Sequence, residues 1–258
     1  MEAYTDFATV YSHIMQDTPY DTWEKFLVRT LKKNGIRDGL VLDLGCGTGE
    51  MTRRLQKRGY DMIGVDVSTE MLQIATAAEH EGILYLNQDM REFELYGTVR
   101  AIVSVCDSMN YLTDSEDFLT TLKLVNNYLD PKGIFIFDLK TVHFFRDVAG
   151  ESVFGENLED CSYIWENYFD NDSKINEYAL TLFLKDGDTY KKSEEIHYQR
   201  GYGITEIKQL IKRSGMDLLE ICDAEDYGPV RRNSERIYVM ARERGKTALK
   251  PELARGKK

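Results

Sequence analysis

The sequence predicts an α/β fold, a doubly wound and mainly parallel sheet into which an antiparallel β meander is inserted. Short apolar runs alternate with helix-like segments over residues 36–145 and again over 201–241, the pattern of consecutive βα units. Between them, residues 146–200 contain runs with bulky side chains at every second position, and Asp-rich turns are predicted at 170–173 and 186–188, as in antiparallel strands. The 258-residue chain is 42% hydrophobic, enough for one large core and an appendage.

The first 35 residues are predicted to form a helical cap. Apolar and aromatic residues recur at helical spacing on both sides of a break at Pro19, namely Tyr4, Phe7, Ala8, Tyr11 and Met15 before it and Trp23, Phe26, Leu27 and Leu31 after it. Asp21 and Glu24 stand in capping-box positions of the second helix, and Gly35 is placed to end it.

Seven strands, with helices between them, are predicted along the core. The apolar runs that indicate strands are 41–44, 59–66, 83–90, 100–106, 134–138, 216–222 and 236–241. Ser68 is the expected N-cap of the helix after the second run, and a late helix is expected over Thr205–Lys212. The helix before the fifth run is indicated by one apolar face, formed by Phe118, Leu122, Val125 and Leu129.

The stretch Val41–Glu50 is the most informative part of the chain. Gly45, Gly47 and Gly49 alternate in the turn between the first strand and the next helix, so a ligand can approach the backbone closely. The start of that helix directs unpaired N–H groups and a positive dipole end at the same place. The dinucleotide fingerprint would need its third glycine at position 50, which is glutamate here. Asp43 beside the turn would repel a pyrophosphate and suits an ammonium or sulfonium ligand.

This run resembles the first motif of class I S-adenosylmethionine (SAM)-dependent methyltransferases, in which a strand ends in D-x-G-C-G-T-G. The resemblance implies a Rossmann-like sheet of seven strands, the last antiparallel, and SAM as cofactor. The N-terminal run Y-x-x-F-A-x-V-Y-x-x-I-M, the following P-Y-x-x-W and the runs 162–167 and 195–200 are similar to a bacterial group of small methyltransferases. That group has no determined substrate and is related to sugar N-methyltransferases. The likeness extends to about Ala241.

Acids at the ends of the next two strands extend the resemblance. It implies that Asp66, with Val67 beside it, accepts hydrogen bonds from both ribose hydroxyls. It also implies that Asp89 and Met90 hold the adenine, although ordinary core packing is the alternative for Met90. The other side chains and glycines predicted to bind SAM at this edge of the sheet are Asp43, Gly45, Cys46, Gly47, Gly49 and Cys106.

Aromatic residues of the N-terminal segment are candidates for the sulfonium end of SAM. In related enzymes an N-terminal helix closes over SAM, which implies this position for Tyr11, Tyr20 and Trp23. A methylsulfonium over an aromatic face gains about 0.5–2 kcal/mol. An aromatic stripe on a helix is more often core, and for Trp23 the core interpretation is preferred.

Methyl transfer is an in-line displacement at an activated methyl group, so positioning supplies much of the rate. A base is needed if the acceptor is an amine cation or a hydroxyl. The predicted catalytic residues are His143, Asp107 and Tyr111, and Glu166 and His197 are further candidates. His143 is favoured by its position just after the fifth strand, although a lone histidine there is more often a hydrogen-bonded loop residue.

The insert leaves the sheet at the carboxyl end of the fifth strand, where ligands of open α/β sheets lie. It is therefore expected to cover the methyl donor and to shape the acceptor pocket. The alternative is a structural or dimer-forming role, which would make the protein a homodimer.

Composition narrows the function further. The four cysteines, at 46, 106, 161 and 222, and the four histidines show no metal-ligand spacing, so no metal is predicted. The net charge of −11 argues against a nucleic-acid surface. The tail 242–258 holds seven basic and two acidic residues, and a solvated, flexible tail is the preferred interpretation. No signal peptide or membrane-spanning run is indicated, so a cytoplasmic protein without a membrane partner is expected.

These observations predict a SAM-dependent methyltransferase that acts on a nitrogen or oxygen of a small molecule. One alternative is a SAM-binding regulatory or scaffold protein without turnover. Another is a tRNA or protein methyltransferase that uses the basic tail.

Overall fold

The computed structural model describes residues 11, 15, 18–78 and 82–246. Its central sheet has seven strands in the order β10-β11-β5-β4-β1-β2-β3. Strands β1 to β5 pair in parallel, and β11 runs antiparallel to both of its neighbours, β5 and β10. The predicted sheet with its last strand antiparallel is therefore confirmed. The strands are β1 (Gly39–Leu44), β2 (Tyr60–Asp66), β3 (Leu84–Asn87), β4 (Val99–Ser104), β5 (Leu129–Lys140), β10 (Asp217–Asp223) and β11 (Arg236–Arg242).

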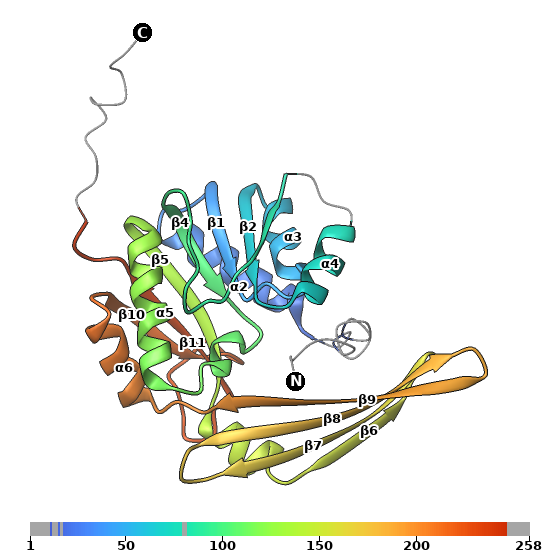
Figure 1. Ribbon diagram of the computed structural model, residues 1–258. Coiled ribbons are helices and arrows are strands. Elements are labelled where there is room, and N and C mark those ends of the chain that lie inside the picture. The colour runs from blue at the N-terminus through green and yellow to red at the C-terminus, as the bar shows by residue number, and fades with distance from the viewer. Residues whose placement is uncertain (1–10, 12–14, 16–17, 79–81, 247–258) are drawn as a thin grey trace.

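Helices cover both faces of this sheet (Figure 1). Because alternate strand residues point to opposite faces, the sheet contributes to two cores. One core packs under α2 and α3, and the other packs under α5 and α6. The helices are α2 (Tyr20–Lys33), α3 (Glu50–Lys57), α4 (Thr69–Ala77), α5 (Ser115–Tyr128) and α6 (Ile204–Arg213), with a 3₁₀ turn η1 (Ser108–Tyr111) and a π-helical turn η2 (Phe144–Ala149).

The predicted capping box of α2 is wrong. Pro19 is the N-cap residue and makes no side-chain cap bond. Asp21 and Glu24 instead form ion pairs with Arg54 of α3, and Glu24 also pairs with Arg58. The two carboxylates therefore bind arginines of the neighbouring helix segment instead of capping the N-terminus of α2.

Other local signals act as expected. The Ser68 hydroxyl accepts a hydrogen bond from the backbone N–H of Met71, 3.1 Å away, as the N-cap of α4. Gly35 follows α2 with a φ of +82°. β5 begins at Leu129, before the predicted start at 134, because the Pro131–Gly133 segment is a bulged part of the strand rather than a loop.

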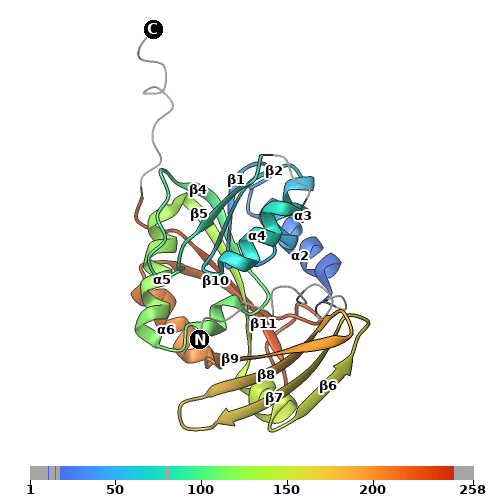
Figure 2. The same ribbon diagram turned by 45° about the vertical axis from the view of Figure 1, so that its right-hand side comes forward.

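The insert forms a second sheet of four antiparallel strands in the order β6-β7-β8-β9. Figures 1 and 2 show it as a separate layer beyond one end of the central sheet. Its two predicted turns, at 170–173 and 186–188, join β7 to β8 and β8 to β9. The strands are β6 (Val153–Asn157), β7 (Cys161–Asp170), β8 (Ile175–Asp186) and β9 (Thr189–Arg200).

Both ends of the chain are described in part. Of the predicted N-terminal stripe, Tyr11 and Met15 are described, whereas Tyr4, Phe7 and Ala8 lie outside the described residues. At the other end, the Lys246 Nζ donates a hydrogen bond to the Asn127 carbonyl, 2.6 Å away, and residues 247–258 lie outside the described part. Within the described ranges, no helix is long and apolar enough to cross a membrane.

Candidate active site

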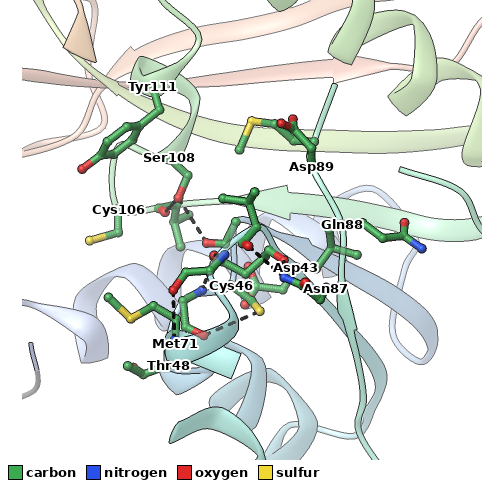
Figure 3. A pocket seen from close by; sticks show the side chains of 18 of the residues that line it. Asp43, Cys46, Thr48, Met71, Asn87, Gln88, Asp89, Cys106, Ser108 and Tyr111 are labelled. Atoms are coloured by element: carbon green, nitrogen blue, oxygen red, sulfur yellow. Dashed lines mark hydrogen bonds between the residues drawn. The ribbon is translucent and has the colours of Figure 1, made fainter. Parts of the chain in front are cut away.

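Two cavities, each of about 580 Å³, adjoin at the carboxyl ends of the central strands. The first, the strand-end pocket, is lined by the glycine-rich turn and by the ends of β1, β2 and β4 (Figure 3). The second, the inter-sheet pocket, lies between the central sheet and the insert. Tyr11, Cys106 and Tyr111 line both pockets, so the two cavities share a wall.

The glycine-rich turn needs conformations that side chains rarely adopt. Gly45, Gly47 and Gly49 have φ angles of +77°, +53° and +74°. A Cβ on Gly45 would lie 2.7 Å from the Ser108 Cβ, whereas one on Gly47 would meet no protein atom within 4 Å. Gly47 therefore keeps its space open beside the strand-end pocket, while Gly45 allows η1 to pack against the turn.

Two carboxylates stand at the strand ends beside this turn. Asp43 accepts a hydrogen bond from the Thr52 hydroxyl, 2.6 Å away, and burial raises the pKa of Asp43 to about 7. The other influences on its pKa are the Thr52 hydroxyl and the neighbouring Asp66, and neither is a cation. Asp66 accepts from the backbone N–H groups of Gly47 (2.7 Å) and Ser68 (2.9 Å). Burial also raises the pKa of Asp66. A cationic ligand group would complete the environment of Asp43.

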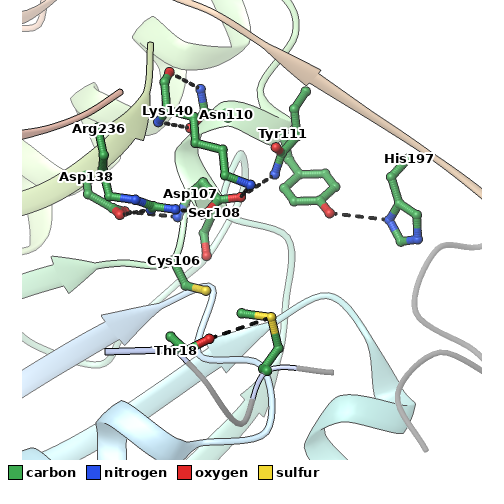
Figure 4. Close-up of polar contacts among 12 residues, drawn as sticks. Thr18, Cys106, Asp107, Ser108, Asn110, Tyr111, Asp138, Lys140, His197 and Arg236 are labelled. Atoms are coloured by element: carbon green, nitrogen blue, oxygen red, sulfur yellow. Dashed lines mark hydrogen bonds and ion pairs between the residues drawn. The ribbon is translucent and has the colours of Figure 1, made fainter. Parts of the chain in front are cut away.

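The end of β4 is strained and strongly charged. Cys106 and Asp107 both adopt left-handed backbone conformations, with φ of 64° and 55°, which is costly for non-glycine residues. The turn places Asp107 in a cluster that we call the buried ion-pair cluster (Figure 4). Its members are Asp107, Asp138, Lys140 and Arg236.

Within the buried ion-pair cluster, Asp107 is held from three sides. Its carboxylate accepts from Arg236 at 2.7 Å and lies 3.2 Å from the Lys140 Nζ. Gln199 of β9 donates a third bond at 2.8 Å. Burial alone would raise the pKa of Asp107, but the charges of Lys140 and Arg236 outweigh it and hold that pKa well below its usual range.

Comparisons with known proteins agree with this geometry. Residues 41–133 match a family model described as a methyltransferase domain. The Bacillus subtilis (strain 168) protein named "Putative methyltransferase YqeM" is 36% identical over 242 residues, which cover 92% of this chain and 96% of that protein. The chain belongs to the methyltransferase family. The predicted enzyme class is thereby confirmed.

Solved structures similar to this methyltransferase include SAM-dependent enzymes. A SAM-dependent methyltransferase from Clostridium acetobutylicum ATCC 824 has a TM-score of 0.82 and 28% identity, and the match covers 95% of this chain and all of that one. SAM-bound CalS10, an amino pentose methyltransferase from Micromonospora echinaspora, has a TM-score of 0.73 over 95% of this chain and 99% of its own, at 14% identity. The second likeness shows the fold alone. Together they confirm the predicted SAM-dependent family and its Rossmann-like fold.

The structure brings most of the predicted SAM-binding residues of the methyltransferase into one place. Gly49 and Trp23 are the exceptions among them, because neither lines the strand-end pocket. A Cβ on Gly49 would collide with the Tyr85 hydroxyl, so this glycine serves the turn itself. Trp23 is 6% exposed and lines the inter-sheet pocket. The predicted residues that do line the strand-end pocket are Tyr11, Tyr20, Asp43, Gly45, Cys46, Gly47, Asp66, Val67, Asp89, Met90 and Cys106.

The structure places the three predicted catalytic residues in different surroundings. His143 is bound through Nδ1 to the Asp147 carboxylate, 2.7 Å away, and lines neither pocket. Asp107 does line the inter-sheet pocket, but its lowered pKa and its three partners leave it a poor base. Tyr111 lines both pockets. Glu166, a further candidate, is exposed on β7 and lines neither.

Several residues of the site were not predicted. Lys140 and Arg236 lie on neighbouring strands, paired in register at the ends of β5 and β11, and Gln199 comes from the insert. The signal available was the spacing of polar residues: Asp138 and Lys140 alternate at the end of an otherwise apolar strand. Such an alternation indicates a polar pocket on one face, but it does not reveal the partner strand.

Proposed function

We propose that this methyltransferase transfers a methyl group from SAM to a nitrogen or oxygen of a small molecule held in the inter-sheet pocket. The observation that carries the proposal is the wall shared by the two pockets, formed by Tyr11, Cys106 and Tyr111. A cavity of about 580 Å³ lies within the ~300–1,000 Å³ range typical of small-molecule sites. An acceptor there would lie next to a donor in the strand-end pocket.

The residues of the strand-end pocket fit SAM. The buried Asp43 carboxylate suits the ammonium of the amino-acid part, and Asp66 offers oxygens to the ribose hydroxyls. Asp89 and Met90 lie in the wall where the resemblance places adenine. When bound, SAM would supply an activated methyl group. The contribution of the chain is to orient donor and acceptor and to keep water away.

The acceptor is proposed to be small rather than a tRNA. Glu225 and Glu235 are exposed residues that line the inter-sheet pocket. The two cations of the pocket, Lys140 and Arg236, are already paired with Asp107 and Asp138. Among the described residues that line this pocket, a polyanion would therefore meet exposed carboxylates rather than the clustered basic side chains that phosphate contacts require.

The full chain should form S-adenosylhomocysteine when it is incubated with SAM and a fractionated pool of cellular metabolites. Mass spectrometry would identify the acceptor by the gain of one CH₂ unit. Total tRNA and a protein lysate are run as separate acceptors, and Asp66→Ala serves as the inactive control. SAM binding without S-adenosylhomocysteine from any acceptor would establish the scaffold alternative, and methylation of tRNA or protein alone would establish the tail-dependent one.

Binding of SAM should release about half a proton at pH 7. Burial raises the pKa of Asp43 from 3.8 to about 7, so in the ligand-free protein its ionisation costs stability as pH rises through that interval. A ligand ammonium would favour the carboxylate and expel the remaining proton. Calorimetry in two buffers of different ionisation enthalpy measures the release. Asp43→Asn should abolish it and weaken binding about tenfold, or about 1.4 kcal/mol; the same release in this variant would exclude the ammonium contact.

A further inference from the structure

We infer that Glu195, His197 and Tyr111 form a proton relay that takes the proton from the methyl acceptor. The inference rests on the proposed function, because it assigns a path for the proton that an amine or hydroxyl loses during methylation. It adds two residues of the insert to the reaction. The insert would then take part in proton transfer as well as line the inter-sheet pocket.

Strand β9 presents the relay toward the central sheet. Glu195, His197 and Gln199 stand at alternate positions, so their side chains share one face of the strand, and all three are buried. Gln199 donates a hydrogen bond to Asp107, just after β4. This bond holds this face of β9 against the carboxyl ends of the central strands. Figure 4 shows the Tyr111 hydroxyl turned toward the His197 ring.

The distances form a continuous path. The Tyr111 hydroxyl oxygen lies 3.3 Å from His197 Nδ1, and the two rings meet edge to face with centroids 6.1 Å apart. On the far side of the ring, Nε2 lies 3.3 Å from the Glu195 Oε2. The 3.3 Å separation at Nε2 is an ion-pair distance. The relay assigns the proton of the neutral ring to Nε2 and the acceptor role to Nδ1, which faces the Tyr111 hydroxyl.

Burial gives the relay its strength. The side chains of His197 and Glu195 are only 4% and 1% exposed. Two charges at this depth attract each other more strongly than they would in water. Glu195 therefore acts as a positioning residue that holds the ring and supports its positive charge after proton uptake.

Tyr111 is the member that reaches the reacting groups. It lines both pockets together with Tyr11 and Cys106. Burial, followed by the charge of Asp107, raises the pKa of the Cys106 thiol to about 12. Burial likewise raises the pKa of Tyr11. These two groups stay protonated at neutral pH, whereas Tyr111 has a histidine behind it to receive its proton.

The relay balances the transfer. The acceptor's lone pair forms the bond to the methyl carbon as the carbon–sulfur bond breaks, and the electron pair of that bond stays on sulfur. The acceptor's proton passes to the Tyr111 oxygen while the Tyr111 proton passes to His197 Nδ1. His197 ends as an imidazolium beside the Glu195 carboxylate and releases its extra proton to solvent after turnover.

The first test compares conservative variants on the metabolite pool used above. Tyr111→Phe and His197→Gln should each slow S-adenosylhomocysteine formation about 100-fold, the size usual for a lost acid–base group, with SAM affinity within about twofold of wild type. Glu195→Gln should slow it about tenfold. The double variant Tyr111→Phe/His197→Gln should be no slower than the single ones, because the residues act as one unit. Tyr198→Phe, an exposed neighbour on the opposite face of β9, is the matched control and should match wild type.

A second measurement does not depend on turnover. Nitrogen NMR of ¹⁵N-histidine-labelled protein reports which ring nitrogen of His197 carries the proton of the neutral ring. The relay requires Nε2, and Glu195→Gln should shift this tautomer balance. A His197 proton on Nδ1, or full activity of Tyr111→Phe beside an active wild type, would overturn the relay. If wild type itself forms no S-adenosylhomocysteine, the proposed function fails and the relay fails with it, whereas either of the two results above leaves the proposed function standing.

Discussion

Replacing Gly47 by valine is expected to weaken SAM binding at least about 100-fold, or about 2.7 kcal/mol, in a protein that still folds. Gly47 lines the strand-end pocket, and a Cβ there meets no protein atom within 4 Å. The valine branches would therefore occupy ligand space without disturbing the core. The left-handed φ of +53° adds a strain of about 1–2 kcal/mol to the folded state.

Gly35→Val is the matched control for this variant. Gly35 also has a positive φ, of +82°, and open space around its Cβ, but it lies at the end of α2 and lines neither pocket. Both variants should lose similar stability in urea denaturation, and only Gly47→Val should lose SAM binding by calorimetry. Equal SAM affinities for the two variants would contradict the assignment of the strand-end pocket to the donor.

The strand-end pocket could be predicted because its parts are local in sequence. Asp43 lies near the end of β1 and the glycines follow that strand directly. Asp66 ends β2, and Asp89 follows β3 by two residues. Parallel strands bring such ends to one edge, so a strand pattern alone places these residues together. The likeness to a known motif then supplied the ligand.

The inter-sheet pocket could not be predicted in the same way. Asp107 bonds Gln199 and Arg236, which lie 92 and 129 residues further along the chain. These contacts depend on how the insert docks and on which strand pairs with β5. Local patterns do not encode either. The same limit applies to His143, which lies just after β5 as expected but whose side chain contacts Asp147.

The failed capping box shows a smaller limit of the same kind. Asp21 and Glu24 have the right spacing for a cap, yet Arg54 and Arg58 of α3 bind them. A charged side chain can bind several kinds of partner with similar strength, so the tertiary neighbours determine which partner it binds. Apolar periodicity has no such competition, and within the described residues the seven core strands and the helices after Pro19 that it indicated are present.

Replacing Arg236 by methionine is expected to lower the free energy of unfolding by about 3–5 kcal/mol, because removal of one partner leaves buried charge uncompensated. Arg236 is the member of the buried ion-pair cluster that binds both Asp107 and Asp138. Among the described residues, the fully buried Asp138 carboxylate would then keep one hydrogen bond, from the Asp107 backbone N–H at 3.0 Å. The Arg236 guanidinium also lies 5.0 Å from the ring centre of Trp23, and methionine cannot replace this cation–π contact.

The loss should depend on pH in a defined direction. Burial already raises the pKa of Asp138, and Arg236 opposes that rise. In Arg236→Met the folded-state pKa of Asp138 rises further above its unfolded value, so the penalty grows as pH rises from about 4. Urea denaturation should show a larger deficit at pH 8 than at pH 5, and Asp138→Asn in the same chain should restore part of it. Arg213→Met, which breaks the exposed pair with Glu116, should cost at most about 1 kcal/mol. An equally small loss of unfolding free energy in Arg236→Met would mean that the buried ion-pair cluster does not stabilise the fold.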